Sequence, residues 1–270
     1  MLIKIFAVLA VLTETLMCLF CDILDGWKDF WIPIVMALGI FIGIIVVYIL
    51  FLLVFSLFLN KNKPCDKPSK FCKFLVDHTV DSALKVLRVK VEVNGIEKIP
   101  TDRRFLLVSN HRSGLDPFVC VSQFMEYNIA YVSKPENFKI PIVGQFCNQC
   151  CYMTIDRENA RNAMKTLHRA TNLVKDDIVS VGIYPEGTRS KTGELLEFKD
   201  GVFYVAKKAP CPVVVITVQN TENILKNFPF KGTKVKLDVL TVLEPESFET
   251  KSTHEISEEV RQMMYENLGK

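Results

Sequence analysis

The sequence predicts an α/β fold, a mixed sheet flanked by helices, preceded by an N-terminal hairpin of two membrane-embedded helices. Three observations support this prediction. Residues 32–59 contain no charged side chain, and such a run exceeds the ~20 apolar residues that a helix needs to cross a bilayer. From residue 85 onward, short apolar or alternating runs indicate strands. Segments with helical periodicity fall between these runs, which is typical of α/β domains.

Residues 1–60 are predicted to form the membrane anchor. Residues 2–20 are apolar apart from Lys4 and Glu14. Both a first transmembrane helix and a secretory signal peptide fit this pattern. We favour the hairpin, because a second apolar segment follows closely and no clear small-residue cleavage site precedes it.

The charges that flank the second apolar segment predict its orientation. The segment before it holds three aspartates and one lysine, and five lysines follow it: Lys61, Lys63, Lys67, Lys70 and Lys73. Because positive charge stays in the cytoplasm, we expect a cell-membrane protein whose C-terminal part faces the cytoplasm. The lysines would also meet anionic lipid headgroups. We therefore predict a basic, amphipathic linker at 61–84 and a cytoplasmic domain at 85–270.

The secondary structure of this domain follows from the periodicity of its apolar residues. Alternating or short apolar runs predict six strands, at residues 87–93, 105–109, 129–133, 178–184, 213–218 and 234–242. Apolar residues at helical spacing predict a helix over residues 159–175, and a polar segment over residues 253–268 predicts a surface helix.

Composition narrows the possible partners. A net charge of +3, from 33 basic and 30 acidic residues, argues against nucleic-acid binding. Nine cysteines at irregular spacing make a poor disulfide framework and favour a reduced compartment. Cys147, Cys150 and Cys151 could suggest zinc, but no second Cys/His pair has a finger-like spacing. We expect no metal, and we interpret these cysteines as small buried hydrophobic residues.

The segment from Asn110 to Pro117 holds a candidate catalytic pair, His111 and Asp116. Residues five positions apart do not share a helical face, so these two side chains can meet only if the chain turns, as Gly114 permits. Asp116 could orient the imidazole while the other ring nitrogen accepts a proton from a substrate hydroxyl. Alternatively, Asp116 caps a helix that begins at Pro117.

Two further segments could bind phosphate. Pro185 to Ser190, after a predicted strand, combines Gly187 with two hydroxyl side chains and the planar guanidinium of Arg189. A polar turn would explain the glycine alone. Arg157 follows a short apolar stretch and precedes a predicted helix. It could be a second phosphate ligand or a surface residue paired with a neighbouring carboxylate.

Taken together and in this order, the three segments resemble the glycerolipid acyltransferase family, specifically its 1-acylglycerol-3-phosphate acyltransferases. The N-H-x-x-x-x-D block is matched at Asn110, His111 and Asp116, and the P-E-G-T-R-S block is matched from Pro185 to Ser190. The block that ends in F-I-D-R is matched at Ile155, Asp156 and Arg157. Residues 133–144 also look like the family's linker between its first two blocks. Cys151, Thr154 and Val215 depart from the family pattern.

The resemblance implies an acyltransferase that acts on lysophosphatidic acid at the bilayer. His111 would be the base and Asp116 its orienting residue, and the phosphate site would involve Arg157, Glu186, Gly187, Thr188 and Arg189. No bound cofactor is expected, since the acyl-CoA or acyl carrier protein thioester is a substrate. Alternative hypotheses are acylation of glycerol-3-phosphate, acylation of another lysophospholipid, and non-catalytic lipid binding.

Overall fold

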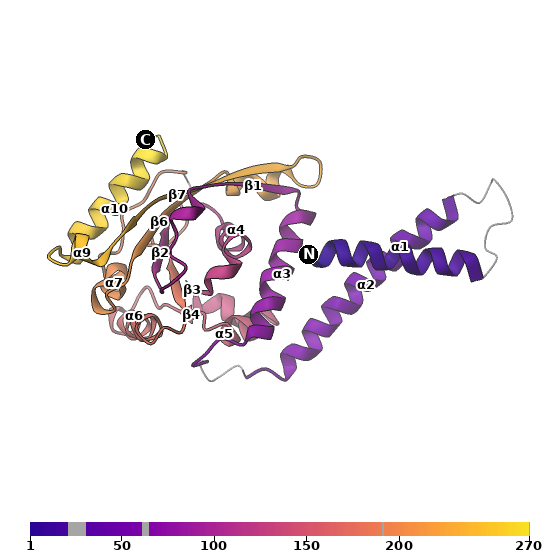
Figure 1. Cartoon of the computed structure of the whole chain (residues 1–270), viewed down its shortest axis with the longest axis horizontal. Helices are drawn as coiled ribbons and strands as arrows, with labels where there is room; N and C mark the ends of the chain where they lie inside the picture. The colour runs from indigo at the N-terminus through magenta and orange to yellow at the C-terminus, as the bar shows by residue number, and fades with distance from the viewer. Residues whose placement is uncertain (21–30, 61–64, 191, 270) are drawn as a thin grey trace. The chain divides into compact units, whose positions relative to one another are not determined.

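The structure, a computed structural model, describes residues 1–20, 31–60, 65–190 and 192–269. The chain divides into two units, Met1–Asn60 and Lys61–Lys270. Figure 1 shows the helices and strands of each unit.

The first unit consists of two helices, α1 (Leu2–Phe20) and α2 (Trp31–Leu57). Both are long and apolar enough to cross a membrane. They pack against each other, and the rings of Phe6 and Tyr48 lie 5.3 Å apart. The two predicted apolar helices are therefore confirmed. The aspartates and the lysine predicted to lie between them fall outside the described residues, as do Lys61 and Lys63.

The second unit is built on a seven-stranded sheet in the order β1-β7-β6-β2-β5-β3-β4. Its strands are β1 (Val89–Asn94), β2 (Leu106–Ser109), β3 (Ile129–Ser133), β4 (Met153–Thr154), β5 (Ser180–Ile183), β6 (Val213–Gln219) and β7 (Thr233–Leu243). β7 runs antiparallel to β6 and parallel to β1, whereas β6, β2, β5, β3 and β4 are all parallel. The mixed sheet is confirmed. The two-residue β4 was missed because so short a strand has no periodicity.

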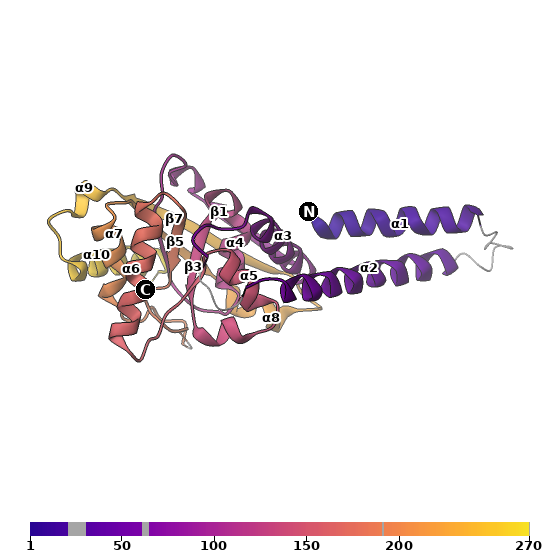
Figure 2. The ribbon, with the colours of Figure 1, turned by 90° about the horizontal axis from the view of Figure 1, so that it is seen from below.

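Helices cover both faces of the sheet (Figures 1 and 2). Successive residues of β2 point to opposite faces, so Leu106 and Val108 belong to one core and Leu107 to the other. The first core includes residues of α6 (Ala160–Lys175), α7 (Tyr204–Lys208) and α10 (Thr253–Asn267). The second includes residues of α3 (Lys70–Val86) and α4 (Asp116–Gln123). The remaining α-helices are α5 (Val143–Gln149), α8 (Ile224–Asn227) and α9 (Pro245–Phe248).

Local capping explains where the two helices predicted from the sequence begin. The Asn159 side chain accepts a hydrogen bond from the Asn162 amide at the start of α6. Ser252 and Glu255 form a capping box at the start of α10. Both helices lie within two residues of their predicted ranges, which is the usual uncertainty of helix ends.

Helix α3 begins in the segment expected to be a basic, amphipathic linker, residues 61–84, and ends at Val86. Ser69 caps its first turn by accepting from the Cys72 amide, and its Leu75 and Leu84 are buried. α3 also packs against α4. The folded globular unit therefore includes residues before position 85, because the amphipathic helix buries its apolar face against the domain.

Candidate active site

The carboxyl ends of five parallel strands meet at one edge of the sheet. The segments that follow β2, β3, β4, β5 and β6 hold His111, Lys134, Arg157, Arg189 and Thr221, respectively. Ligands of open α/β sheets bind at this edge. Residues from distant parts of the sequence are thus brought to one region of the globular unit.

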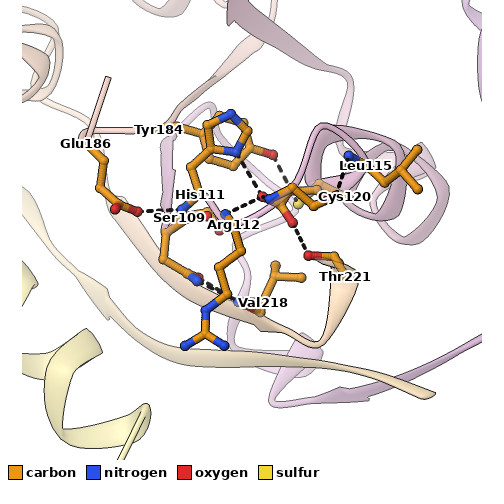
Figure 3. Close-up of polar contacts among 12 residues, drawn as sticks. Ser109, His111, Arg112, Leu115, Cys120, Tyr184, Glu186, Val218 and Thr221 are labelled. Atoms are coloured by element: carbon orange, nitrogen blue, oxygen red, sulfur yellow. Dashed lines mark hydrogen bonds and ion pairs between the residues drawn. The ribbon is translucent and has the colours of Figure 1, made fainter. Parts of the chain in front are cut away.

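The predicted pair of His111 and Asp116 is formed (Figure 3). The Nδ1 atom of His111 lies 2.8 Å from Oδ2 of Asp116. The loop that bends the chain between them is anchored by Asn110, whose side chain donates to the carbonyl of Val218 and accepts from its amide. Both residues of the pair are well enclosed, with His111 13% and Asp116 1% exposed at the side chain.

Asp116 organises the loop rather than capping a helix. Its Oδ2 also accepts from the backbone amides of Arg112 and Ser113, at 2.7 and 2.8 Å. Its Oδ1 accepts from the hydroxyl of Thr221, which follows β6. Helix α4 begins at Asp116 itself, so the N-cap interpretation is wrong. A spacing of five residues allows the His–Asp contact because the carboxylate of Asp116 points toward the preceding turn and not toward the helix that follows.

This arrangement selects one tautomer of His111. A carboxylate only accepts hydrogen bonds, so Nδ1 must carry the proton and Nε2 is left as the acceptor. The imidazole stacks on Tyr184, with ring centroids 4.4 Å apart and planes inclined by 28°. Tyr184 in turn contacts Cys120, and burial raises the pKa of both groups, that of Cys120 to about 12. The surface beneath the imidazole is therefore uncharged at neutral pH.

Glu186, from the Pro185–Ser190 block, connects that block to the segment that holds His111. Its Oε1 accepts from the amide of His111 and its Oε2 from the amide of Leu196, at 2.5 and 3.0 Å. The amide of Ser190 donates to the carbonyl of His111 at 2.9 Å. Burial raises the pKa of Glu186, although the two amide hydrogen bonds oppose this shift. Both oxygens of Glu186 therefore accept backbone hydrogen bonds, which tie the loop after β2 to the segment after β5.

A cavity of about 740 Å³ lies among these segments. It is lined by Arg112, Lys134, Thr188, Arg189, Ser190, Thr192, Gly193, Glu222, Asn223 and Lys226. Four of these residues are basic and one is acidic, which suits an anion. The hydroxyl of Ser190 is buried and has no partner among the described residues.

Two arginine side chains of the cavity have defined neighbours. Arg112 donates to the carbonyl of Gly193 at 3.1 Å and lies 3.8 Å from Glu222. Arg189 approaches the loop of the catalytic pair, since a Cβ atom added to Gly114 would lie 3.5 Å from its Nη1. The guanidinium of Arg189 therefore lies close to the His–Asp loop, at a distance that a Cβ atom at position 114 would tolerate.

The structure brings together most of the predicted site residues. Thr188 and Arg189 line the cavity, and Gly187 has a φ of +67°, which permits the turn between Glu186 and Thr188. Arg157 is exposed and does not line this cavity. Its neighbour Asp156 accepts hydrogen bonds from the amides of Glu158 and Asn159 and from the side chain of Asn162, at the entry to α6.

Sequence analysis missed four residues of the site: Arg112, Lys134, Thr221 and Lys226. Lys134 lies in the segment identified as a linker between blocks, and Arg112 lies inside the first block. Thr221 and Lys226 follow β6, more than 100 residues after His111 in the sequence. Only the pairing of β6 with β2 brings that segment to the catalytic loop.

The cysteine cluster lies at the end of α5, where Cys147 is in the helix and Cys150 and Cys151 directly follow it. Burial raises the pKa of Cys147 and of Cys151 to about 12 and that of Cys150 further. Thiols with such pKa values are protonated at neutral pH, and metals bind the thiolate. Within the described ranges, no group of three His, Cys, Asp or Glu side chains could hold a metal ion.

Replacement of Thr221 by valine tests its role as a positioning residue. The change removes the hydroxyl donor and leaves Oδ1 of Asp116 buried without a partner, which costs about 1–3 kcal/mol of stability. If Asp116 orients His111 as a base and does not contact substrate, kcat should fall more than KM changes. Thr221→Ser should restore both stability and kcat, and an unaltered kcat in Thr221→Val would contradict this role.

Comparison with known proteins agrees with this geometry. Residues 90–219 match the family model described as Acyltransferase. The chain is 37% identical over 137 residues to a chloroplastic 1-acyl-sn-glycerol-3-phosphate acyltransferase of Brassica napus, an alignment covering 50% of this chain and 39% of that protein. It is 28% identical over 187 residues to the 1-acyl-sn-glycerol-3-phosphate acyltransferase of Saccharomyces cerevisiae, which covers 68% of this chain and 61% of the yeast protein.

A solved structure has the same fold. The crystal structure of the 1-acyl-sn-glycerophosphate (LPA) acyltransferase PlsC from Thermotoga maritima matches with a TM-score of 0.64. The match covers 99% of this chain and 96% of that one, at 22% identity. The aligned region in the Brassica and yeast relatives amounts to less than two thirds of their length. The match to the family model described as Acyltransferase, over residues 90–219, contains the His–Asp pair and the Pro185–Ser190 block.

Proposed function

We propose that this protein transfers a fatty-acyl group from an acyl thioester to the sn-2 hydroxyl of 1-acylglycerol-3-phosphate, giving phosphatidic acid. The observation that supports this most directly is the oriented His111–Asp116 pair beside a cavity rich in basic side chains. The names of the relatives point to the same reaction.

The proposed chemistry needs one base and a substrate hydroxyl as nucleophile. Nε2 of His111 takes the hydroxyl proton as the oxygen attacks the thioester carbonyl carbon. The negatively charged Asp116 stabilises the imidazolium that forms, and it remains ionised throughout. The tetrahedral intermediate then collapses, the C–S bond breaks, and the leaving thiolate takes the proton back from His111. The donor, acyl-CoA or acyl carrier protein thioester, is a substrate, and the chemistry uses no metal or bound cofactor.

The cavity would hold the phosphate of the acceptor. Arg112, Lys134, Arg189 and Lys226 supply positive charge, and the unpartnered hydroxyl of Ser190 supplies a donor. Charge-assisted hydrogen bonds to phosphate are stronger than neutral ones, and a guanidinium can bind two phosphate oxygens at once. A phosphate held there would fix the position of the glycerol hydroxyl relative to His111.

We also propose that α1 and α2 hold the domain at the cytoplasmic face of the cell membrane. Both helices have the length and composition of membrane spans. A lysophospholipid and its diacyl product reside in the bilayer, and removing an acyl chain into water would cost about 0.8 kcal/mol for each methylene. A tethered site acts on the lipid without that extraction.

The reaction is tested with the full chain purified in detergent. Lysophosphatidic acid is supplied with acyl-CoA and, separately, with acyl carrier protein thioester, while thiol release and phosphatidic acid are followed. Product with one donor would establish the reaction and the donor together. Product only from glycerol-3-phosphate or from another lysophospholipid would replace the proposed acceptor. Lipid binding with no product from any donor would contradict catalysis.

Replacement of Arg189 or Lys134 by alanine tests the phosphate site. Loss of a charge-assisted hydrogen bond of about 1.5–3 kcal/mol should raise KM for lysophosphatidic acid by roughly 10- to 100-fold, with a smaller change in kcat. Arg103→Ala is the matched control, because Arg103 is half exposed and paired with Glu244 away from the cavity. An unchanged KM in both cavity variants would contradict the proposed site.

Arg157 remains a predicted phosphate ligand, and the same assay tests it. If Arg157→Ala raises KM as strongly as Arg189→Ala does, the phosphate contacts residues after both β4 and β5. If KM is unchanged, the phosphate is held by the side chains that line the cavity.

A further inference from the structure

An exposed apolar segment lies in α8 and in the turn that leads from α8 to β7. Leu225, Phe228 and Phe230 are 66%, 38% and 92% exposed, and we call these three residues the apolar tip. Large apolar side chains that are exposed together in one short segment mark an interaction site more often than single ones do. The core needs none of them, since the neighbouring Ile224 is fully buried and anchors α8.

The backbone of the apolar tip is held in place by hydrogen bonds. Nη1 of Arg88, between α3 and β1, donates to the carbonyls of Pro229 and Phe230 at 3.2 and 3.3 Å. The amide of Lys231 donates to the carbonyl of Asn227 at 2.8 Å. Asn227 also donates from its side chain to Thr233 at 2.8 Å. The folded structure therefore holds the apolar tip in its exposed position.

The charges within the segment that holds the apolar tip have one sign, and Glu222 and Asp238 flank this segment. Residues 223–237 contain four lysines and neither aspartate nor glutamate: Lys226, Lys231, Lys234 and Lys236. Lys236 is paired with Asp238 at 2.6 Å, whereas Lys231 and Lys234 are exposed. Exposed aromatic and aliphatic side chains with lysines beside them suit the interface of an anionic bilayer, where rings enter the acyl boundary and ammonium groups meet headgroups.

One residue that lines the cavity is adjacent to the apolar tip in the sequence. Lys226 lines the cavity, and it lies next to Leu225 on the four-residue helix α8. We propose that the apolar tip docks the globular unit onto an anionic lipid surface, so that the bilayer lies beside the opening of the cavity. This contact is made by the globular unit itself, in addition to any made by α1 and α2, and it does not depend on the reaction proposed above.

Tryptophan fluorescence of the full-length chain tests this docking. Trp27 and Trp31, the two native tryptophans, are replaced by phenylalanine, and Phe230→Trp is introduced as the reporter. The protein is reconstituted in vesicles of phosphatidylcholine and phosphatidylglycerol with brominated acyl chains. We expect emission at shorter wavelength, strong quenching by the brominated lipid and weak quenching by aqueous iodide.

A matched control separates docking from mere tethering by the anchor. Tyr265→Trp in the same background places the reporter on α10, a helix that lies apart from α8 (Figure 2), at a residue that is also exposed. This reporter should be quenched by iodide and only slightly by brominated lipid. Lys231→Glu with Lys234→Glu should reduce the lipid quenching of the Phe230→Trp protein toward the level of the control.

Two results would overturn the proposal. One is equal quenching of the two reporters by brominated lipid. The other is shielding of the Phe230→Trp reporter that increases with protein density in the bilayer, because the tip would then contact a second protein. Neither result bears on turnover of lysophosphatidic acid, so failure of the docking proposal and failure of the proposed function are distinguishable.

Discussion

Replacement of His111 by alanine is expected to lower kcat/KM for acyl transfer by about a hundred- to ten-thousand-fold, the usual contribution of a positioned general base. The imidazole is the group whose Nε2 is left as an acceptor by the contact with Asp116. The substrate hydroxyl would then lose its proton only to water. The measurement is thiol release with lysophosphatidic acid and the preferred donor, in detergent.

The fold should survive this substitution. Asp116 would keep the amides of Arg112 and Ser113 and the hydroxyl of Thr221, so the loop would remain closed. His254 offers a matched control, because its Nδ1 lies 3.0 Å from Asp200 in a second, exposed His–Asp pair. His254→Ala should leave the rate unchanged. A fully active His111→Ala protein would exclude the proposed base.

Replacement of Asp116 by asparagine is expected to cause a loss of similar size, about a hundred- to ten-thousand-fold in kcat, by removing the charge that stabilises the imidazolium. The amide oxygen can still accept from the backbone of the loop, and the Thr221 hydroxyl can rotate to accept from the new amide group. The variant therefore separates the charge of Asp116 from its structural role. The measurement pairs kcat with the midpoint of thermal unfolding.

Asp200→Asn is the corresponding control, since Asp200 has a histidine partner but lies outside the cavity lining. It should have wild-type kcat. If Asp116→Asn kept full kcat, Asp116 would be purely a loop-forming residue. If it lost activity only in proportion to unfolding, the same conclusion would follow.

Much of the fold could be predicted from periodicity. The strands near residues 105–109, 129–133 and 213–218 are short apolar runs because both faces of the sheet are covered by helices, as the burial of every residue of β2 shows. The α6 helix has an apolar stripe that packs on one core. Residues 61–84 were expected to form a basic, amphipathic linker, because the local pattern gives no cue to what the amphipathic helix packs against.

The candidate site, too, was partly predictable from the sequence and partly decided by the tertiary structure. Sequence alone determined the residue types and spacing of His111, Asp116 and the Pro185–Ser190 block, and from these the family resemblance, because each block is local in the chain. Only the tertiary structure decided which groups those side chains meet. Asp116 accepts hydrogen bonds from the amides of residues that precede it in the chain instead of capping α4. Glu186 accepts hydrogen bonds from two backbone amides. Thr221 and Lys226 reach the site only through the pairing of β6 with β2, a contact between segments far apart in sequence that local patterns do not encode.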